Sequence, residues 1–267
     1  MHVLPIVHET PGLLFVNKPP NMGFHASATT FDAGVLPLLR TMQREGALSY
    51  EGRLHAVHRL DRVTSGLLMV AKTAEAAGSV SALLRQRELD KYYVALSGRT
   101  PSKKQGRVVG DMARSRRGQW MLTRTRANPA VTAFLSRRVE LERGSESDDS
   151  AARSLRAFLL KPLTGRTHQL RVALKCLGSP VLGDPMYAAS SDAAREDRAY
   201  LHAAALRLPA GYPELSGTGD AVAVVCRPHE GAAFRSAAFQ RLWEEEEWFS
   251  EAAEGTWFAG TAVASRS

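Results

Sequence analysis

The sequence is poor in cysteine and contains no long hydrophobic run. Its 267 residues include only two cysteines, Cys176 and Cys226, and no C-x-x-C pair. This scarcity argues against a thiolate metal site and a disulfide framework, and it fits a reducing compartment. No apolar run approaches the about 18 residues that a membrane helix needs, and the N-terminal segment lacks a signal-peptide pattern. We therefore expect a cytoplasmic protein that makes no contact with a membrane.

Acidic residues are scarce in one segment, residues 99–126. The whole chain has 35 Lys and Arg against 27 Asp and Glu, a formal net charge of +8. Residues 99–126 hold nine Lys and Arg and a single acid, Asp111, so nine minus one accounts for the net charge of the chain. A basic segment in an otherwise neutral chain is typical of a protein that binds a polyanion, most simply RNA. A solvated loop that only aids solubility is the alternative.

The pattern of apolar residues predicts an α+β fold. Runs rich in apolar, aromatic or β-branched residues predict strands at 13–18, 67–71, 90–98, 131–141, 154–163, 200–208 and 221–228. Helical spacing predicts helices at 31–46 (with Asp32 as its cap), 74–88, 166–178 and 234–249. Because strands and helices do not alternate regularly, we expect a mixed, largely antiparallel sheet with flanking helices.

The composition also suggests where the domain ends. We expect residues 1–248 to form one domain and residues 249–267, rich in small residues, to form a frayed tail. Within the domain, the basic segment 99–126 is interpreted as one or two hairpins or as an arm over the body. The acidic, Ser-rich stretch at 144–152 is interpreted as a mobile loop.

The clearest chemical signal is the stretch from His58 to Gly66, HRLDRVTSG. Asp61 stands between Arg59 and Arg62, and the Thr, Ser and Gly that follow favour a turn. Asp61 is therefore expected on a loop that leads into a strand. Two nearby guanidinium groups could keep its carboxylate ionised and could also bind an anionic substrate. An Asp that only caps a turn, with its arginines in solvent, is the alternative.

This stretch resembles the H-R-L-D-x-x-T-S-G signature of the RluA family of RNA pseudouridine synthases. Four further stretches resemble motifs of that family in the right order: NKPPNMGFH (17–25), DKYYVALSG (90–98), LTGRTHQLRVALKCLGSPVLGDPMY (163–187) and, more weakly, YLHAAALRL (200–208). The resemblance implies a mixed sheet with a central catalytic cleft. It begins so early in the chain that we expect no N-terminal RNA-binding module of the kind that some relatives carry.

The resemblance implies that the protein isomerises a specific uridine in ribosomal or transfer RNA to pseudouridine. That reaction detaches uracil from its ribose, turns it and rejoins it through carbon, so neither a metal nor another cofactor is expected. The family assigns the catalytic carboxylate to Asp61, which either attacks the sugar or removes a proton. It assigns the cationic partner of Asp61 to Arg171. It assigns Tyr93 to stacking on the uracil, with its hydroxyl a candidate acceptor for the ring proton.

Other residues are candidates for binding the RNA. By resemblance, Arg59 is expected to help extrude the base or to fill the gap that it leaves. His25 and Leu206 are lesser candidates for the pocket wall. In the basic segment, the exposed cations expected to contact phosphates are Arg114, Arg116 and Arg117.

Two rival functions fit parts of the sequence. A non-catalytic RNA-binding protein on the same fold would be expected to lack Asp61, Tyr93 or Arg171, and all three are present. A metal-dependent hydrolase would need His55, His58 and Asp61 on one helical face, whereas this segment is predicted to be strand and loop. The sequence therefore favours an isomerase that acts on RNA, and we expect it to be a monomer.

Overall fold

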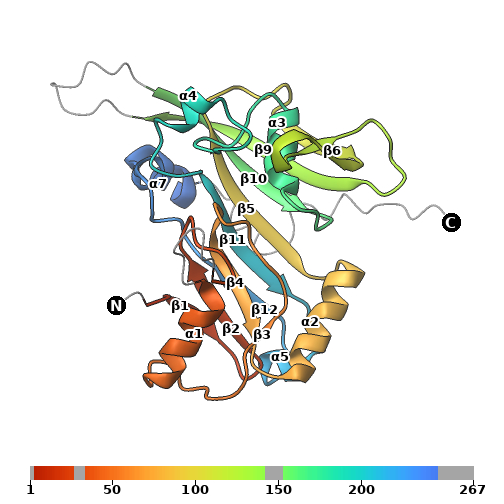
Figure 1. The fold of residues 1–267 in the computed structure, drawn as a ribbon, viewed down its shortest axis with the longest axis vertical. Coiled ribbons are helices and arrows are strands. Elements are labelled where there is room, and N and C mark those ends of the chain that lie inside the picture. Colours follow the sequence, from red (N-terminus) through yellow and green to blue (C-terminus); the bar gives the residue numbers. More distant parts are fainter. Residues whose placement is uncertain (1–2, 27–33, 142–152, 246–267) are drawn as a thin grey trace.

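The computed structural model describes residues 3–26, 34–141 and 153–245, and a ten-stranded sheet runs through it (Figure 1). The strands of this sheet are β1 (Ile6–Glu9), β2 (Leu13–Lys18), β3 (His55–Ala56), β4 (Ser65–Ala71), β5 (Asp90–Ser97), β6 (Gln105–Gly110), β9 (Ala130–Leu141), β10 (Arg153–Pro162), β11 (Leu201–Leu208) and β12 (Val222–Val225). A separate hairpin consists of β7 (Met112–Arg114) and β8 (Trp120–Leu122).

The sheet is mixed and largely antiparallel, as the sequence predicts. The hydrogen-bonded order is β1-β2-β4-β11-β5-β10-β9-β6, with β12 paired to β11 and β3 paired to β4. Among the strands described, β4 and β11 form the one parallel pair. The helices are α1 (Val35–Arg44), α2 (Ala74–Gln86), α3 (Gln169–Cys176), α4 (Ser190–Ala193), α5 (Pro213–Ser216), α6 (Ala232–Arg235) and α7 (Ala237–Glu245). In the described part of the chain, no helix combines the length and apolar character needed to cross a membrane.

An apolar core covers each face of the sheet, and β5 contributes to both. Side chains alternate along a strand, so Tyr93 packs in the core that contains apolar residues of α1, α2 and α3. Its neighbour Tyr92 packs in the other core, with Phe234 of α6 and Phe239 of α7. The alternation therefore decides which of two adjacent tyrosines shares a face with α3.

Two predicted helices are shorter than expected. The helix predicted at 31–46 begins at Val35, and its expected cap, Asp32, lies outside the described residues. The helix predicted at 166–178 begins only at Gln169, because His168 has a left-handed backbone (φ 57°, ψ 17°) that cannot belong to a right-handed helix. The predicted stop at Gly178, where φ is 74°, agrees with the structure.

The C-terminal helix predicted at 234–249 is wrong as a single element. Ser236 is extended (φ −58°, ψ 141°), and this residue separates α6 from α7. Residues 144–152 and 249–267, which the sequence suggested to be a mobile loop and a tail, lie outside the described residues.

The basic segment 99–126 is not an arm along its whole length. Strand β6 joins the edge of the main sheet through six antiparallel residue pairs with β9. The hairpin of β7 and β8 is the part that forms a sheet of its own. The expectation of a hairpin is thus confirmed, whereas an arm beginning at residue 99 is wrong because β6 belongs to the body.

Candidate active site

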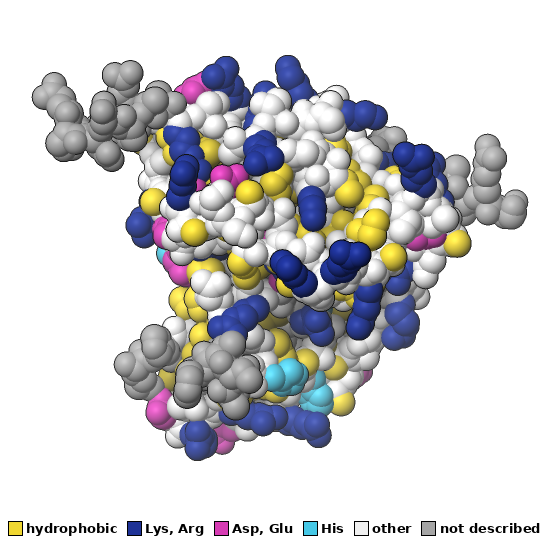
Figure 2. All heavy atoms as spheres, turned by 45° about the horizontal axis from the view of Figure 1, so that its top comes forward, with side chains coloured by type: hydrophobic (Ala, Val, Ile, Leu, Met, Phe, Trp, Pro, Cys, Tyr) yellow, Lys and Arg dark blue, Asp and Glu magenta, His cyan; other side chains and the backbone are white. Residues whose placement is uncertain are grey.

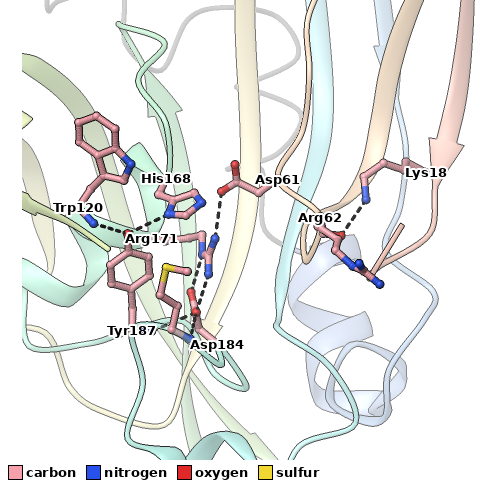
Figure 3. Close-up of polar contacts among 9 residues, drawn as sticks. Lys18, Asp61, Arg62, Trp120, His168, Arg171, Asp184 and Tyr187 are labelled. Atoms are coloured by element: carbon pink, nitrogen blue, oxygen red, sulfur yellow. Dashed lines mark hydrogen bonds and ion pairs between the residues drawn. The ribbon is translucent and has the colours of Figure 1, made fainter. Parts of the chain in front are cut away.

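Asp61 lies on the loop between β3 and β4, as the sequence predicts. The Thr64 amide donates to the Asp61 carbonyl at 3.0 Å and closes a turn, and Leu60 is buried in the core. The ammonium group of Lys18, itself only 1% exposed, donates to the Arg62 carbonyl at 3.1 Å (Figure 3). These contacts hold the backbone on both sides of Asp61, while its side chain remains 19% exposed.

The glycine that ends the same motif allows two strands to approach. Gly66 has a φ of 103°, a conformation that glycine adopts far more easily than other residues. A Cβ at this position would lie 2.2 Å from the Ala203 carbonyl oxygen of β11. The close parallel contact of β4 and β11 therefore requires glycine here.

Arg171, in the first turn of α3, binds two carboxylates (Figure 3). Its Nε and Nη2 donate to the two Asp184 oxygens at 2.7 and 2.8 Å, and its Nη1 lies 3.4 Å from Asp61 Oδ2. Burial disfavours the charge of Arg171, but the hydrogen bonds and charge of Asp184, followed by Asp61, outweigh burial and raise its pKa. The structure thus brings Arg171 to Asp61 and keeps it cationic.

Asp184 is a residue to which the sequence analysis assigned no role. It is fully buried, and besides Arg171 its Oδ1 accepts from the Met186 and Tyr187 amides at 2.9 and 3.1 Å. Asp184 therefore connects the turn at residues 184–187 to the guanidinium group of Arg171. Its place in the GDPMY end of a matched motif was a usable signal, although sequence spacing alone does not show that it binds Arg171.

Two cavities meet at Asp61. The Tyr93 cavity, about 910 Å³, is lined by Tyr93, Leu201 and residues 161–170, among others. The Arg171 cavity, about 1090 Å³, is lined by Arg171, His25 and Arg117, among others. The two share residues 58–61 and His168. Asp61 can therefore be reached from two sides. On the face of the molecule shown in Figure 2, Lys and Arg side chains prevail over those of Asp and Glu.

Tyr93 remains a protonated phenol at neutral pH. Burial, followed by the negative charge of Asp61, raises the pKa of Tyr93 well above its usual range. A phenol in this state is a poor base, so the geometry favours stacking and hydrogen bonding over acceptance of the ring proton. The ring of Tyr93 lines the Tyr93 cavity, and Asp61 lines both this cavity and the Arg171 cavity.

Some of the other predicted site residues line the two cavities and others do not. Arg59 lines both cavities and is exposed, and His25 and Arg117 line the Arg171 cavity. Arg114 and Arg116 are exposed on or beside the hairpin and line neither cavity. These four arginines and His25 lie on or next to the two cavities or the hairpin that packs beside them.

The prediction of Leu206 as pocket wall is wrong. Leu206 is buried in the core, where it pairs with Lys91 of β5 and Val224 of β12, and it lines neither cavity. Leu201, at the other end of β11, lines the Tyr93 cavity instead. The prediction failed because the side chain of Leu206 is covered by the apolar core.

The residues proposed for a metal site are otherwise engaged. His58 Nε2 accepts from the Met69 amide at 2.9 Å, and burial, followed by the charge of Lys91, lowers its pKa to about 3. His55 lies on β3, not on a helix. Within residues 3–26, 34–141 and 153–245, no three His, Cys, Asp or Glu side chains cluster in a way that could hold a metal ion. The geometry therefore gives no support to the hydrolase hypothesis.

The β7–β8 hairpin packs against the turn that contains Asp184. The Trp120 amide donates to Tyr187 Oη at 2.9 Å, and Gln119 Nε2 donates to the Met186 carbonyl at 2.8 Å. The Arg114 guanidinium lies 5.6 Å from the centre of the Trp120 ring. The most basic part of the chain is thus joined to the site that holds Asp61 and Arg171.

Comparisons with known proteins agree with this geometry. Residues 12–175 match the model of a family described as RNA pseudouridylate synthase. An uncharacterised RNA pseudouridine synthase of Haemophilus influenzae is 45% identical over 226 residues, 85% of this chain and 88% of that protein. The dual-specificity RNA pseudouridine synthase RluA of Escherichia coli is 32% identical over 209 residues, 77% and 86% of the two chains. The solved structure of human RNA pseudouridylate synthase domain containing 1 superposes with a TM-score of 0.63 at 28% identity, covering 85% of this chain and 83% of that one.

Proposed function

This chain belongs to the RNA pseudouridylate synthase family, isomerases that act on RNA, and from that premise we propose a substrate and a set of roles. The substrate is a uridine in ribosomal or transfer RNA, and the reaction takes place in the cytoplasm, on a monomer that needs no metal or other cofactor. The observation that carries the proposal is the position of Asp61, at the junction of two cavities and 3.4 Å from Arg171.

Asp61 acts on the sugar of the target nucleotide. The bond between ribose C1′ and uracil N1 breaks and uracil C5 bonds to C1′. The hydrogen of C5 leaves as a proton and N1 takes up a proton, so the product is an isomer of the substrate. An ionised carboxylate next to C1′ serves this exchange as a nucleophile or as a proton acceptor. Arg171 supports either role, because a cation within hydrogen-bond reach favours the ionised form of Asp61.

The Tyr93 cavity receives the uracil. The detached base must stay bound while it turns, and a largely buried aromatic ring offers a surface on which it can stack. Leu201 supplies a second apolar wall of the same cavity. Arg59, which lines both cavities, is placed to occupy the gap that the extruded base leaves in the RNA.

The RNA backbone lies along the basic hairpin. Arg114, Arg116 and Arg117 are exposed beside the Arg171 cavity, and exposed guanidinium groups bind phosphates without regard to sequence. The hydrogen bonds from Gln119 and Trp120 to the 186–187 turn hold the hairpin at the site. Positioning by the hairpin would thus align the RNA with Asp61.

The test is tritium release by the purified protein from cellular RNA labelled at uracil C5, since rejoining at that carbon expels its hydrogen. Ribosomal and transfer RNA are assayed as separate fractions, with and without excess chelator. We expect release from at least one fraction at a rate that chelator leaves unchanged. Binding of RNA without release from any fraction would support the rival, non-catalytic function. A map of pseudouridines in cells with and without the gene then identifies the uridine.

A further inference from the structure

Among the residues that the structure describes, His168 is the only one outside the 58–61 segment that lines both cavities at Asp61. It directly precedes α3, three positions before Arg171. Figure 3 shows its imidazole ring between Asp61 and Tyr187. No role has been given to this residue above, and its place at the junction makes it a candidate for contact with the nucleotide that reacts there.

The backbone of His168 is unusual. Its φ of 57° and ψ of 17° lie in the left-handed region, which few residues other than glycine adopt and which costs free energy. In the described chain this conformation occurs at four non-glycine residues: Asn21, Arg87, Arg117 and His168. Backbone conformations of this kind gather at functional sites, where the surrounding contacts impose them. Here the contact is made by Tyr187, whose hydroxyl lies 2.9 Å from His168 Nδ1.

Two hydrogen bonds at Tyr187 Oη favour one tautomer of the His168 ring. The Trp120 amide can only donate, so Tyr187 Oη accepts from it at 2.9 Å, and the phenolic hydrogen remains for a second partner. His168 Nδ1 lies within reach of that hydrogen, and we assign it the role of acceptor. Burial lowers the pKa of His168 against the opposing charge of Asp61, which favours the neutral ring; with Nδ1 as acceptor, its hydrogen is on Nε2. Among the described residues, the hydrogen bond of the His168 ring is the one at Nδ1, and none is formed at Nε2.

We infer that His168 contacts the substrate and donates a hydrogen bond from Nε2 to an oxygen of the target nucleotide beside its glycosidic bond. The inference rests on the proposed function, since it requires a nucleotide to occupy the junction of the two cavities. The oxygens next to that bond are uracil O2 and the ribose 2′-hydroxyl, both of which accept hydrogen bonds. Because a neutral imidazole carries no positive charge, it can bind either of these oxygens without replacing Arg171 as the ion-pair partner of the Asp61 carboxylate.

The charged groups around the ring fit a neutral donor. Asp61 and Asp184 favour a proton on the imidazole, while Arg171 and Arg59 disfavour a second positive charge. Tyr187 keeps its hydrogen because burial raises the pKa of its phenol. The orientation of the ring therefore depends on the hydroxyl of Tyr187, which makes Tyr187 a positioning residue.

Two substitutions separate contact with the substrate from a structural role. In His168→Gln the side-chain nitrogen reaches about as far as Nε2 and can still donate. In His168→Asn the amide reaches only as far as Nδ1; it can still bond to Tyr187, and asparagine tolerates the left-handed backbone. We expect single-turnover tritium release by His168→Gln within about threefold of wild type and release by His168→Asn about tenfold slower. RNA affinity should change little in either variant.

A third variant tests the orientation of the ring. Tyr187→Phe removes the hydroxyl that holds Nδ1 and should slow release less than His168→Asn does. Combined with His168→Asn it should add little further loss, because Tyr187 acts by orienting a donor that Asn no longer supplies. RNA with 2′-deoxyuridine at the target then identifies the acceptor. If the ribose oxygen is the acceptor, the difference between wild type and His168→Asn disappears; if uracil O2 is the acceptor, the difference persists.

The inference would be overturned by a His168→Asn enzyme that reacts at the wild-type rate, or by His168→Gln losing as much as His168→Asn. Either result, with an active wild type, leaves the proposed function standing. A wild type that releases no tritium from any RNA removes the proposed function, and the inference with it. The wild-type rate therefore distinguishes the two failures.

Discussion

The Arg171 guanidinium is bound more closely by Asp184 than by Asp61. Two bonds of 2.7 and 2.8 Å join it to Asp184, whereas its contact with Asp61 is 3.4 Å long. Asp184 is fully buried, so it acts as the permanent partner that fixes the planar fork. Asp61 contacts only Nη1, the guanidinium nitrogen that Asp184 does not bind. The Asp61 carboxylate therefore remains available to a nucleotide.

Replacing Asp184 should weaken the fold as well as the site. Asp184→Asn leaves Arg171 as a buried charge without its main partner, a change that costs about 3–5 kcal/mol in comparable buried pairs. Unfolding in urea measures the loss. The matched control is Asp192→Asn, which breaks the exposed pair with Arg99 and should cost less than about 1 kcal/mol. Equal, small losses in the two variants would contradict the buried pairing.

Replacing Arg171 should separate charge from geometry. Arg171→Lys keeps the charge but not the fork and should retain part of the tritium-release activity. Arg171→Met should be nearly inactive, and it should also be less stable because Asp184 loses its partner. The double variant Arg171→Met/Asp184→Asn removes the unpaired charge, so it should regain stability without regaining activity. A fully active double variant would show that Asp61 needs no cationic partner.

Salt dependence should report the contacts of the hairpin. If the basic segment meets about four to six phosphates, the logarithm of RNA affinity should fall against that of salt concentration with a slope of about −3 to −5. Changing Arg114, Arg116 and Arg117 to Ser should flatten this slope and weaken all RNAs to a similar extent. Ser at three exposed arginines outside the segment and both cavities is the control: Arg44, Arg138 and Arg227. A slope that changes only in the control would assign RNA binding to another surface.

Two histidines with lowered pKa values should make the protein sensitive to mild acid. Burial lowers the pKa of His58 and of His202 to about 3, against about 6.5 in the unfolded chain. Below pH 6.5 the unfolded state therefore binds protons that the folded state does not, so stability falls as the pH falls. The slope is about 1.4 kcal/mol per pH unit for each histidine. Urea unfolding between pH 6 and 4.5 should give a slope lower by about this amount in His202→Gln, and an unchanged slope would contradict the neutral, buried state of His202.

Much of the site could be predicted because its residues lie within local patterns. The turn formers Thr64, Ser65 and Gly66 place Asp61 on a loop before a strand, and this is observed. The alternation of side chains along β5 distinguishes Tyr93 from Tyr92 once the buried face is known. The spacing of Leu170, Leu174 and Leu177 predicts the buried face of α3 correctly.

The parts that sequence could not provide depend on contacts between distant segments. Asp184 binds Arg171 only because the 184–187 turn folds back beneath α3, and no local pattern encodes that contact. The left-handed backbone of His168 shortens α3 against its helical spacing, since tertiary contacts outweigh the local preference. Leu206 was misplaced because its burial follows from the pairing of β11 with β5 and β12 and from the core packed around it, not from its own residues.

The central claim is that the Asp61 carboxylate carries out the reaction, and Asp61→Asn tests it most directly. Asn has nearly the same volume and still forms hydrogen bonds, but it is neither an effective nucleophile nor a proton acceptor. The variant should fold and bind RNA as the wild type does, because Asp184 still pairs with Arg171. The measurement is single-turnover release of tritium from RNA labelled at uracil C5. We predict no detectable release by Asp61→Asn beside rapid release by the wild type, and release at the wild-type rate would contradict the account.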